Sequence, residues 1–188
     1  MSDAGAGFSL REAVPTDLPS ISLIYAYHVK FGLASFEDDA PDEAEMRRRL
    51  DDVWERGLPW LVAEDASATV RGYAYAQPYR LRSAYRFTLE DSIYIAPDWL
   101  RRGLGRALLA RLIERCAAGN FRQMVAVIGD SANAASIGLH ERLGFRRVGL
   151  LPAVGFKHRR WVDCVLMQRA LGEGDATPPV EHGTRPTP

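Results

Sequence analysis

The chain has 188 residues, enough for one domain of ordinary size, and 47% of them are hydrophobic, enough to bury a substantial core. Its 24 Lys and Arg residues equal its 24 Asp and Glu residues, whereas a nucleic-acid-binding protein needs a basic excess to displace phosphate counterions. No apolar run approaches the roughly 20 residues that span a bilayer, and Cys116 and Cys164 lack the spacing of a metal site. We therefore expect no nucleic-acid partner, no membrane partner, no metal, and free thiols in a reducing cytoplasm.

The first half of the chain begins with a small, polar segment over Met1–Gly7, which we expect to be a loose leader without the features of a signal peptide. Apolar and polar residues then alternate over Phe8–Ala13, as they do in a half-buried strand. Pro15–Asp17 is a helix-start signal, and apolar residues follow it at helical spacing. The rest of this half predicts a charged helix and three strands, over residues 41–56, 60–64, 70–79 and 87–95.

In the second half, Leu104, Leu108, Leu112 and Cys116 recur every four residues and predict a helix over Gly103–Ala118, with Cys116 buried and inert. A strand covered on both faces, a helix that ends at a glycine, and two last strands are predicted over residues 124–128, 133–143, 146–154 and 161–169. Gly, Pro, Thr and charged residues dominate from residue 172 onward, which predicts a disordered tail over 172–188.

The order of elements, β-α-α-β-β-β-α-β-α-β-β, predicts one α/β domain over residues 8–171. Strands that are adjacent in sequence before Gly103 can pair as antiparallel hairpins, whereas the strand–helix–strand units after it need crossover connections and a parallel pairing. We therefore expect a mixed sheet with helices on both faces. The sequence contains no internal repeat and no second domain.

The segment 92–109 is the most informative part of the chain, because it reads as a strand, a turn and a loop that opens a helix. A helix N-terminus leaves backbone N–H groups unpaired and carries partial positive charge, and Gly103 and Gly105 let an anion approach those groups. Three cationic side chains surround the same point: Arg101, Arg102 and Arg106. The pattern predicts a pyrophosphate site, and its alternative is a tight strand-to-helix connection with solvated arginines.

This segment resembles the coenzyme A pyrophosphate loop of the GNAT acetyltransferases, whose pattern is Gln or Arg, two residues, Gly, one residue, then Gly or Ala. Leu100 stands at the first position here, a modest departure because the main chain does most of the binding. The segment Asn133–Phe145 resembles the other half of the GNAT cofactor site, an Asn, a helix and Leu-Gly-Phe. His140 occupies the aromatic position of that motif, where Tyr is commoner.

Five further segments narrow the resemblance to the phosphinothricin N-acetyltransferase group, which also includes methionine sulfone and sulfoximine acetyltransferases. These segments are Trp60–Glu64, Gly72–Ala76, Ala84–Glu90, Val125–Gly129 and Val154–His158. The resemblance implies a GNAT fold, a splayed mixed sheet with acetyl-CoA wedged between the strand before the loop and the strand after the long helix. It also implies transfer of an acetyl group to the amine of a small amino-acid-like molecule, and a homodimer.

The resemblance assigns Glu90 the role of general base. An ammonium group has no lone pair, so a proton must leave before nitrogen attacks a thioester, and a nearby carboxylate can accept it directly or through a water. The alternative is a surface charge at a strand start. The adjacent Asp91 ranks lower, because neighbours along a strand face opposite sides and the two are not expected to line the site together.

The resemblance assigns several residues to acetyl-CoA: Ile93, Tyr94, Ile95, Arg101, Arg102, Gly103, Leu104, Gly105, Arg106, Asn133 and Ser136. The two isoleucines are expected to contribute main-chain groups, since their side chains suit the core. An Asn before a helix also suits an N-cap. His140 is assigned a catalytic role, as proton donor to the leaving thiolate or hydrogen-bond partner of its sulfur. A partly buried structural histidine is the alternative.

Four residues are assigned to the acceptor: Arg80, Arg82, Tyr85 and Ser92. A guanidinium group can hold a substrate carboxylate through two parallel hydrogen bonds, although two solvated loop arginines are an equal alternative. Two other functions stay open. A GNAT enzyme can acetylate a protein N-terminus or lysine, and a domain of this kind can serve as a non-catalytic acyl-CoA sensor.

Overall fold

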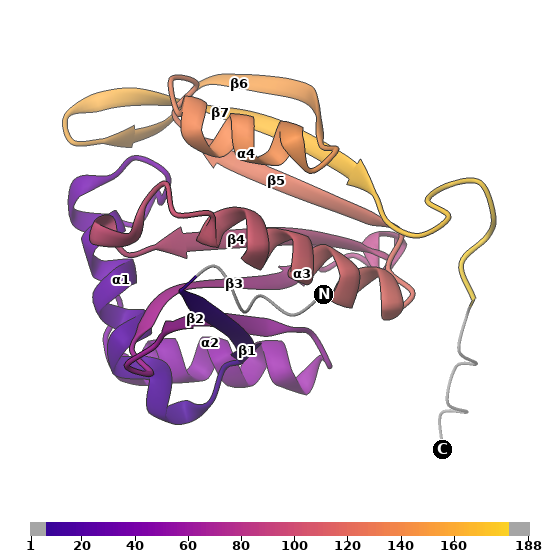
Figure 1. The fold of residues 1–188 in the computed structure, drawn as a ribbon. Coiled ribbons are helices and arrows are strands. Elements are labelled where there is room, and N and C mark those ends of the chain that lie inside the picture. Colours follow the sequence, from indigo (N-terminus) through magenta and orange to yellow (C-terminus); the bar gives the residue numbers. More distant parts are fainter. Residues whose placement is uncertain (1–6, 181–188) are drawn as a thin grey trace.

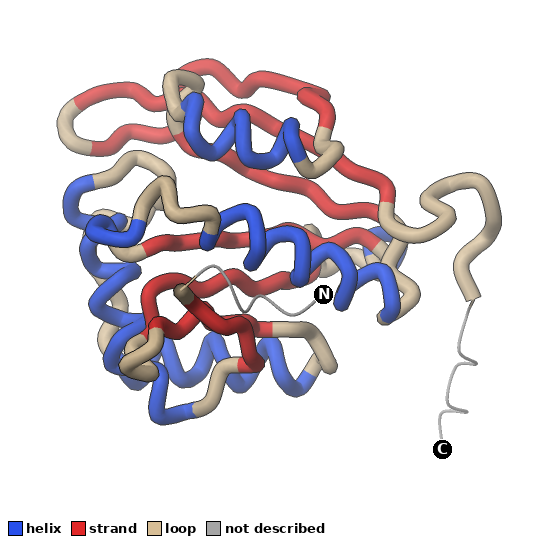
Figure 2. Tube along the Cα trace, viewed as in Figure 1, coloured by secondary structure: helices blue, strands red, loops and turns tan. Residues whose placement is uncertain are grey.

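The computed structural model describes residues 7–180, which form a seven-stranded mixed sheet with helices on both faces (Figures 1 and 2). The strands are β1 Phe8–Glu12, β2 Trp60–Asp65, β3 Val70–Pro78, β4 Thr88–Ile95, β5 Gln123–Gly129, β6 Arg146–Lys157 and β7 Arg160–Ala170. The helices are α1 Leu18–Phe31, α2 Glu43–Glu55, α3 Leu104–Ala118 and α4 Ala134–Arg142. The predicted fold class and order are confirmed, and short 3-10 helices that were not predicted occur at Pro15–Asp17, Ser83–Tyr85 and Pro97–Trp99.

The strands lie in the order β1-β2-β3-β4-β5-β7-β6, and the neighbours pair antiparallel except for the parallel pair β4–β5. The crossover through α3 therefore gives the expected parallel pairing. The crossover through α4 does not, because β7 forms a hairpin with β6 and takes the place beside β5. The expectation of a second parallel pair was wrong for that reason.

The two faces of β3 differ in side-chain size. On one face Gly72 makes room for Ile95 of β4, because an added Cβ would lie 2.7 Å from the Cδ1 atom of Ile95, and Leu108 of α3 packs over the same point. On the other face Tyr73 and Tyr75 stack with Trp60 of β2, at ring-centroid distances of 5.8 and 4.2 Å. Figure 1 shows α3 in front of this part of the sheet and α2 behind it. Small residues under α3 and aromatic residues under the other helices thus set the two layers.

The sheet splits between β4 and β5. These strands pair only where Thr88–Glu90 lies opposite Gln123–Val125, and they diverge beyond that point (Figure 1). The edge of β4 that faces β5 consequently has no strand partner from Asp91 to Ile95 within the described residues. The resemblance implied a splayed sheet. In the structure the split begins after the last paired residue, Glu90, so that Asp91 is the first residue of β4 without a partner in β5.

The chain after β7 runs back along the start of β5. Arg122 donates hydrogen bonds to Thr177 Oγ1 at 3.3 Å and to the Pro178 carbonyl at 3.2 Å, and Asn120 donates one to the Val180 carbonyl at 2.8 Å. Residues 172–180 include these contacts, and the disordered tail expected over 172–188 stays a prediction. The remainder of the predicted tail and the leader, apart from Gly7, lie outside the described residues.

Among the helices of the described chain, none has the length and apolar character needed to cross a bilayer.

Candidate active site

A cavity of about 710 Å³ occupies the splay between β4 and β5. Volumes of this size are typical of sites for small organic ligands. Its lining comes from α1, the α1–α2 loop, α2, β3, β4, β5, α4 and β7. The residues that carry polar chemistry in it are Tyr25, Ser35, Glu37, Glu45, Arg48, Arg49, Asp52, Arg56, Tyr75, Gln77, Glu90, Asp91, Ser92, Tyr94, Ser136, His140 and Cys164.

Glu90 lies at the last paired position of β4, where the cavity begins. Burial raises the pKa of its carboxyl group above the ordinary value, and the charge of Asp91 raises it further. The charge of Arg80 and a hydrogen bond from Gln77 oppose that increase. A carboxylate with a raised pKa is a stronger base, so this position suits proton acceptance from a substrate.

Asp91 and His140 form a buried pair across the apex of the splay. His140 Nε2 lies 3.0 Å from Asp91 Oδ2, and the two residues are 2% and 7% exposed. His140 Nδ1 lies 2.8 Å from the carbonyl oxygen of Ser136. Asp91 does face away from Glu90, as expected, but both residues line the cavity because the split opens both faces of the sheet. The sequence argument missed this pairing, since contacts between β4 and α4 depend on tertiary structure.

The predicted pyrophosphate loop lies at the N-terminus of α3. Gly103 caps the helix with φ of +88°, a conformation that L side chains rarely adopt, and it leaves open space on the Cβ side. Arg101, Arg102 and Arg106 are exposed around it, and Arg102 stacks over Trp99 at 4.6 Å. The cationic arginine side chains and the positive end of the helix repel each other. A bound anion would relieve this repulsion, so the arrangement favours anion binding.

Gly105 serves the packing behind this loop. An added Cβ there would lie 3.3 Å from Leu139 of α4 and 3.9 Å from Ile93 of β4. Ile93 and Ile95 thus point toward α3 and belong to the core, as expected. Tyr94 points the other way and packs edge-on against Tyr25 at 5.0 Å.

One main-chain hydrogen-bonding group near the end of β4 already has a side-chain partner. His28 Nε2 lies 2.8 Å from the carbonyl oxygen of Ile95, a contact that the sequence did not predict. On α4, the side chain of Asn133 accepts a hydrogen bond from the Ser136 backbone at 3.1 Å and is therefore the N-cap. The capping carbonyl leaves the amide NH₂ group of Asn133 as a separate donor.

The predicted acceptor residues fall into two groups. Ser92 lines the cavity and forms a hydrogen bond with Tyr75, whose pKa is raised by burial to about 12. Arg80 is exposed and lies outside the cavity lining, but it is close enough for its charge to act on Glu90. Arg82 and Tyr85 are exposed on the β3–β4 loop and are not part of the cavity lining.

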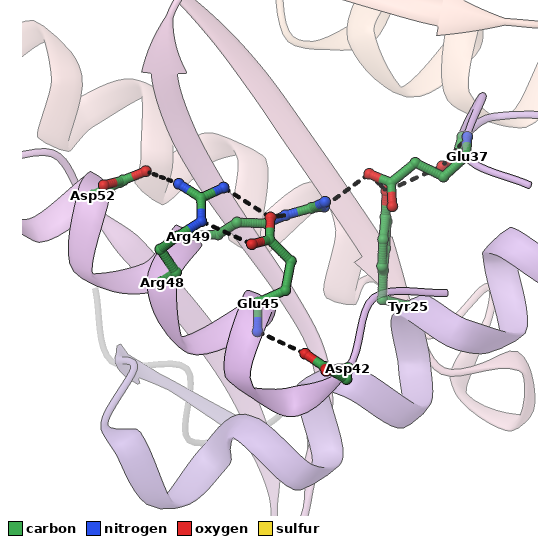
Figure 3. A network of polar contacts seen from close by, with 8 residues as sticks. Tyr25, Glu37, Asp42, Glu45, Arg48, Arg49 and Asp52 are labelled. Carbon is green, nitrogen blue, oxygen red and sulfur yellow. Dashed lines mark hydrogen bonds and ion pairs between the residues drawn. The ribbon is translucent and has the colours of Figure 1, made fainter. Parts of the chain in front are cut away.

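A polar network that the sequence did not predict lines the opposite wall, and Figure 3 shows it from close by. Arg49 donates to Glu37 at 2.8 Å and to Glu45 at 2.8 Å, and the Tyr25 hydroxyl donates to Glu37 at 3.0 Å. Arg48 pairs with Glu45 and Asp52 on the exposed side of α2. The spacing of charged residues in α2 could have indicated ion pairs along that helix. No local pattern shows that Arg49 also contacts Glu37 of the α1–α2 loop.

The α1–α2 loop also contacts the far half of the sheet. The ring of Phe36 fills the space beside Gly155 of β6, where an added Cβ would lie 2.5 Å from it. Lys157 is buried and donates to the carbonyl oxygen of Ser35 at 2.7 Å. These contacts join the two halves of the splayed sheet across the cavity.

No group of three or more His, Cys, Asp or Glu side chains among the described residues could hold a metal ion.

Comparison with known proteins identifies the relatives of this chain. Residues 24–145 match the acetyltransferase (GNAT) family. A phosphinothricin N-acetyltransferase of Alcaligenes faecalis is 58% identical over 171 residues, which cover 91% of this chain and 86% of the relative. An L-methionine sulfoximine/L-methionine sulfone acetyltransferase of Pseudomonas aeruginosa is 42% identical over 170 residues, covering 90% and 98%.

A solved structure agrees with these matches. The crystal structure of a GNAT superfamily phosphinothricin acetyltransferase from Sinorhizobium meliloti, in complex with acetyl-CoA, superposes with a TM-score of 0.91. It is 50% identical, and the superposition covers 94% of this chain and 95% of that one.

Proposed function

The chain belongs to the GNAT acetyltransferase family and is an acetyl-CoA-dependent N-acetyltransferase, and on this premise we propose that its acceptor is a small amino acid of the phosphinothricin or methionine sulfoximine kind. The relatives that act on such acceptors cover most of this chain. The α1–α2 loop and its contacts to β6 bridge the two halves of the sheet beside the cavity, which suits a small acceptor better than an extended peptide.

Acetyl-CoA supplies a thioester as the acetyl donor. The N-terminus of α3, with Gly103 and its three arginines, binds the pyrophosphate, and the unpaired edge of β4 offers main-chain groups to the pantetheine arm. Leu104 and Gly105 contribute the first backbone N–H groups of the helix. Asn133 and Ser136, at the start of α4, lie on the far side of the splay and complete the cofactor site.

Glu90 accepts the proton of the acceptor ammonium, and the amine then attacks the thioester carbon. The single observation that carries this role is the placement of Glu90, half-buried at the apex of the splay with a raised pKa. His140 acts at the sulfur atom of the thioester C–S bond that breaks. Ser92 and Tyr75 form the wall beside Glu90 on its own face of the sheet.

Arg80 recognises the carboxylate of the acceptor. Its charge acts on Glu90, so an α-amino acid can place its amine at one group and its carboxylate at the other. Arg82 and Tyr85 lie farther out on the same loop and have a smaller role in this proposal.

The test is a thiol-release assay with matched acceptors. We expect phosphinothricin and methionine sulfoximine to turn over, and the decarboxylated amine of each to react roughly ten- to a hundredfold more slowly, because one desolvated ionic hydrogen bond is lost. Arg80→Gln should remove this preference, and Arg82→Gln is the matched control that should keep it. Equal turnover of amino acid and amine, or turnover of a peptide N-terminus alone, would contradict the proposed acceptor.

We also propose that the enzyme is a cytoplasmic homodimer. The edge strand β6 carries a row of exposed apolar side chains, and Trp161 of β7 lies beside its Phe156 at 5.2 Å. A long apolar edge strand is an aggregation hazard unless something covers it, and a second copy of the chain would do so. The two cysteines are both buried and unpaired, which fits a reducing compartment.

A further inference from the structure

The two nearest hydrogen-bond partners of His140 favour a ring that is protonated on both nitrogens. The nearest partner of each ring nitrogen is an atom that only accepts: Nδ1 is 2.8 Å from the Ser136 carbonyl oxygen, and Nε2 is 3.0 Å from Asp91 Oδ2. The Ser136 hydroxyl, which can donate or accept, lies farther from Nδ1, at 3.5 Å. A neutral imidazole has one N–H donor and one acceptor nitrogen, so it would leave one of these contacts as a repulsion between lone pairs. An imidazolium ion donates to both.

We propose that Asp91 is a positioning residue that keeps His140 as an imidazolium, and that His140 stabilises the leaving thiolate as a fixed cation instead of giving up a proton. This inference rests on the proposed function, because that function puts the thioester in the splay. In the transfer step the C–N bond forms, the C–S bond breaks and its electron pair goes to sulfur. The ammonium proton goes to Glu90, and the pair Asp91–His140 stays charged throughout.

The geometry explains why the proton stays. Both N–H groups of His140 are already used by its own chain, so neither points at a substrate. Loss of the Nε2 proton would leave a lone pair facing the Asp91 carboxylate in a buried site, where such repulsion is poorly screened. The edge contact of the His140 ring with Phe145, at a centroid distance of 5.0 Å, also limits rotation of the ring.

The pair has two ends with different effects. Its negative end lies on β4 next to Glu90, whose pKa is raised first by burial and then by the Asp91 charge. Its positive end lies on α4, across the splay from β4. The charge of the negative end thus raises the basicity of Glu90, and in the proposed step the positive end stabilises the leaving thiolate.

Other titratable groups around His140 do not provide an alternative partner. Cys116 of α3 is buried, and its thiol pKa is raised to about 12 by burial and by the charge of Asp91. Cys164 of β7 is also buried, and burial raises its pKa. On α4 itself, Glu141 and Arg142 are exposed. Burial by itself would lower the pKa of His140, but the hydrogen bond and charge of Asp91 and the Ser136 carbonyl raise it overall.

The first test is independent of turnover. The intact protein is labelled with ¹⁵N-histidine, and the ring nitrogens are followed by NMR as pH is raised, with His140→Gln to assign the resonance among the four histidines. We expect both nitrogens of His140 to be protonated at pH 7 and to titrate above the ordinary value of about 6.5. His28 is the internal control, because burial lowers its pKa and it should titrate below that value.

The second test uses Asp91→Asn, which keeps the shape and removes the charge. The His140 titration should move down by about one unit or more. The kcat should fall roughly ten- to a hundredfold at pH 8 while the KM for acetyl-CoA stays nearly unchanged. The difference in kcat between the variant and the parent should shrink at lower pH, where His140 is protonated even without the Asp91 charge.

The outcomes separate this inference from the proposed function. A His140 that is neutral at pH 7 in the parent protein overturns the inference even if the enzyme acetylates amino acids. A protonated His140 combined with full kcat of Asp91→Asn at pH 8 overturns the role in the reaction. An inactive parent with a protonated His140 contradicts the proposed acceptor and leaves the protonation result intact. The parent spectrum decides the protonation even if the variant folds poorly.

Discussion

At the scale of single residues, the proposed role of Glu90 as the base makes the response of the enzyme to pH depend on the environment of this side chain. Its pKa is raised mainly by burial, so the protonated form persists above the ordinary range of a glutamate and the base is lost as pH falls through that raised value. An α-amine with a pKa of about 8 arrives mostly protonated at neutral pH. The proposed mechanism therefore makes the transfer depend on Glu90 most strongly near neutrality.

The substitution Glu90→Gln tests this dependence. It keeps the side-chain shape and removes the basicity, so turnover at pH 7 should fall by roughly 10²–10⁴, the usual value of general-base help. Higher pH should partly restore the rate, because more of the acceptor is already deprotonated. The measurement is a pH–rate profile of both proteins on one acceptor, with acetyl-CoA affinity measured separately and expected to be unchanged. Superimposable profiles would make Glu90 a structural strand residue.

At the scale of elements, the N-terminus of α3 combines a backbone conformation with a charge pattern. Gly103 holds φ at +88°, and the exposed arginines lie around the helix end. A side chain at this position strains the backbone and also fills the open space that an anion needs. These two effects can be separated, since Gly57 has a similar φ of +67° and equally open surroundings at the end of α2.

We predict that Gly103→Val and Gly57→Val lower the melting temperature to a similar extent, because each forces a branched residue into a left-handed conformation at a cost of about 1–2 kcal/mol. Only Gly103→Val should also weaken acetyl-CoA binding strongly. Isothermal titration and the rise in melting temperature with added acetyl-CoA provide the measurement. Unchanged affinity in Gly103→Val would remove the loop from the cofactor site.

A second element-scale prediction concerns the junction of β1 with α1. The buried carboxylate of Asp17 accepts hydrogen bonds from Arg11 at 2.6 and 2.8 Å and from the Val14 backbone at 2.8 Å. Burial opposes ionisation, but these bonds outweigh it and lower the pKa of Asp17 below 3.8. The stabilisation is therefore present above about pH 3.8 and is lost as pH falls through the lower, folded-state value.

Asp17→Asn should reduce the free energy of unfolding at pH 7 by about 1–3 kcal/mol, since a buried charged hydrogen-bond partner is lost. The control is Asp51→Asn, which breaks an exposed ion pair with Arg47 on α2 and should cost about 0.5 kcal/mol or less. Urea titrations at pH 7 and pH 3 measure both effects. A similar loss in the two variants at pH 7 would show that the β1–α1 contact adds nothing beyond a surface pair.

At the scale of the whole molecule, the seven-stranded sheet ends in β6, a twelve-residue strand with one unpaired edge. Its exposed apolar side chains include Val148, Leu150 and Phe156, which are 57%, 52% and 59% exposed. Burial of such side chains between two copies is worth about 25 cal/mol per Å², so the surface favours self-association. The helix α4 contacts the start of β6 through the ion pair of Glu141 with Arg147, and Val148, Leu150 and Phe156 stay exposed beyond it.

We expect the protein to sediment as a dimer and Leu150→Glu to shift it toward the monomer, because a charge would be buried in the contact. Leu23→Glu is the control, since Leu23 is 74% exposed on α1 and far from β6 in sequence and sheet order. Sedimentation velocity across a range of concentrations measures the change. A monomeric parent protein, or dissociation by both variants alike, would contradict the proposed interface.

The sequence by itself determined the order and type of the strands and helices, because the periodicity of apolar residues is a local property. It predicted the buried stripe that contains Cys116, whose side chain is 1% exposed. It also placed glycines and arginines together at the start of α3, since they are close together in the chain, and the binding of the cofactor there stays a prediction. Glu90 was predicted from motif position, and its placement in the cavity agrees with that position.

Only the tertiary structure decided which residues meet across the splay. The strand order β5-β7-β6 depends on how a hairpin docks, which no local pattern encodes. The contact of Asp91 with His140 spans 49 residues, and the contact of Lys157 with Ser35 spans 122. Such pairs form because the fold brings distant segments into one buried, poorly screened site, where a carboxylate, a histidine and a carbonyl group must satisfy each other.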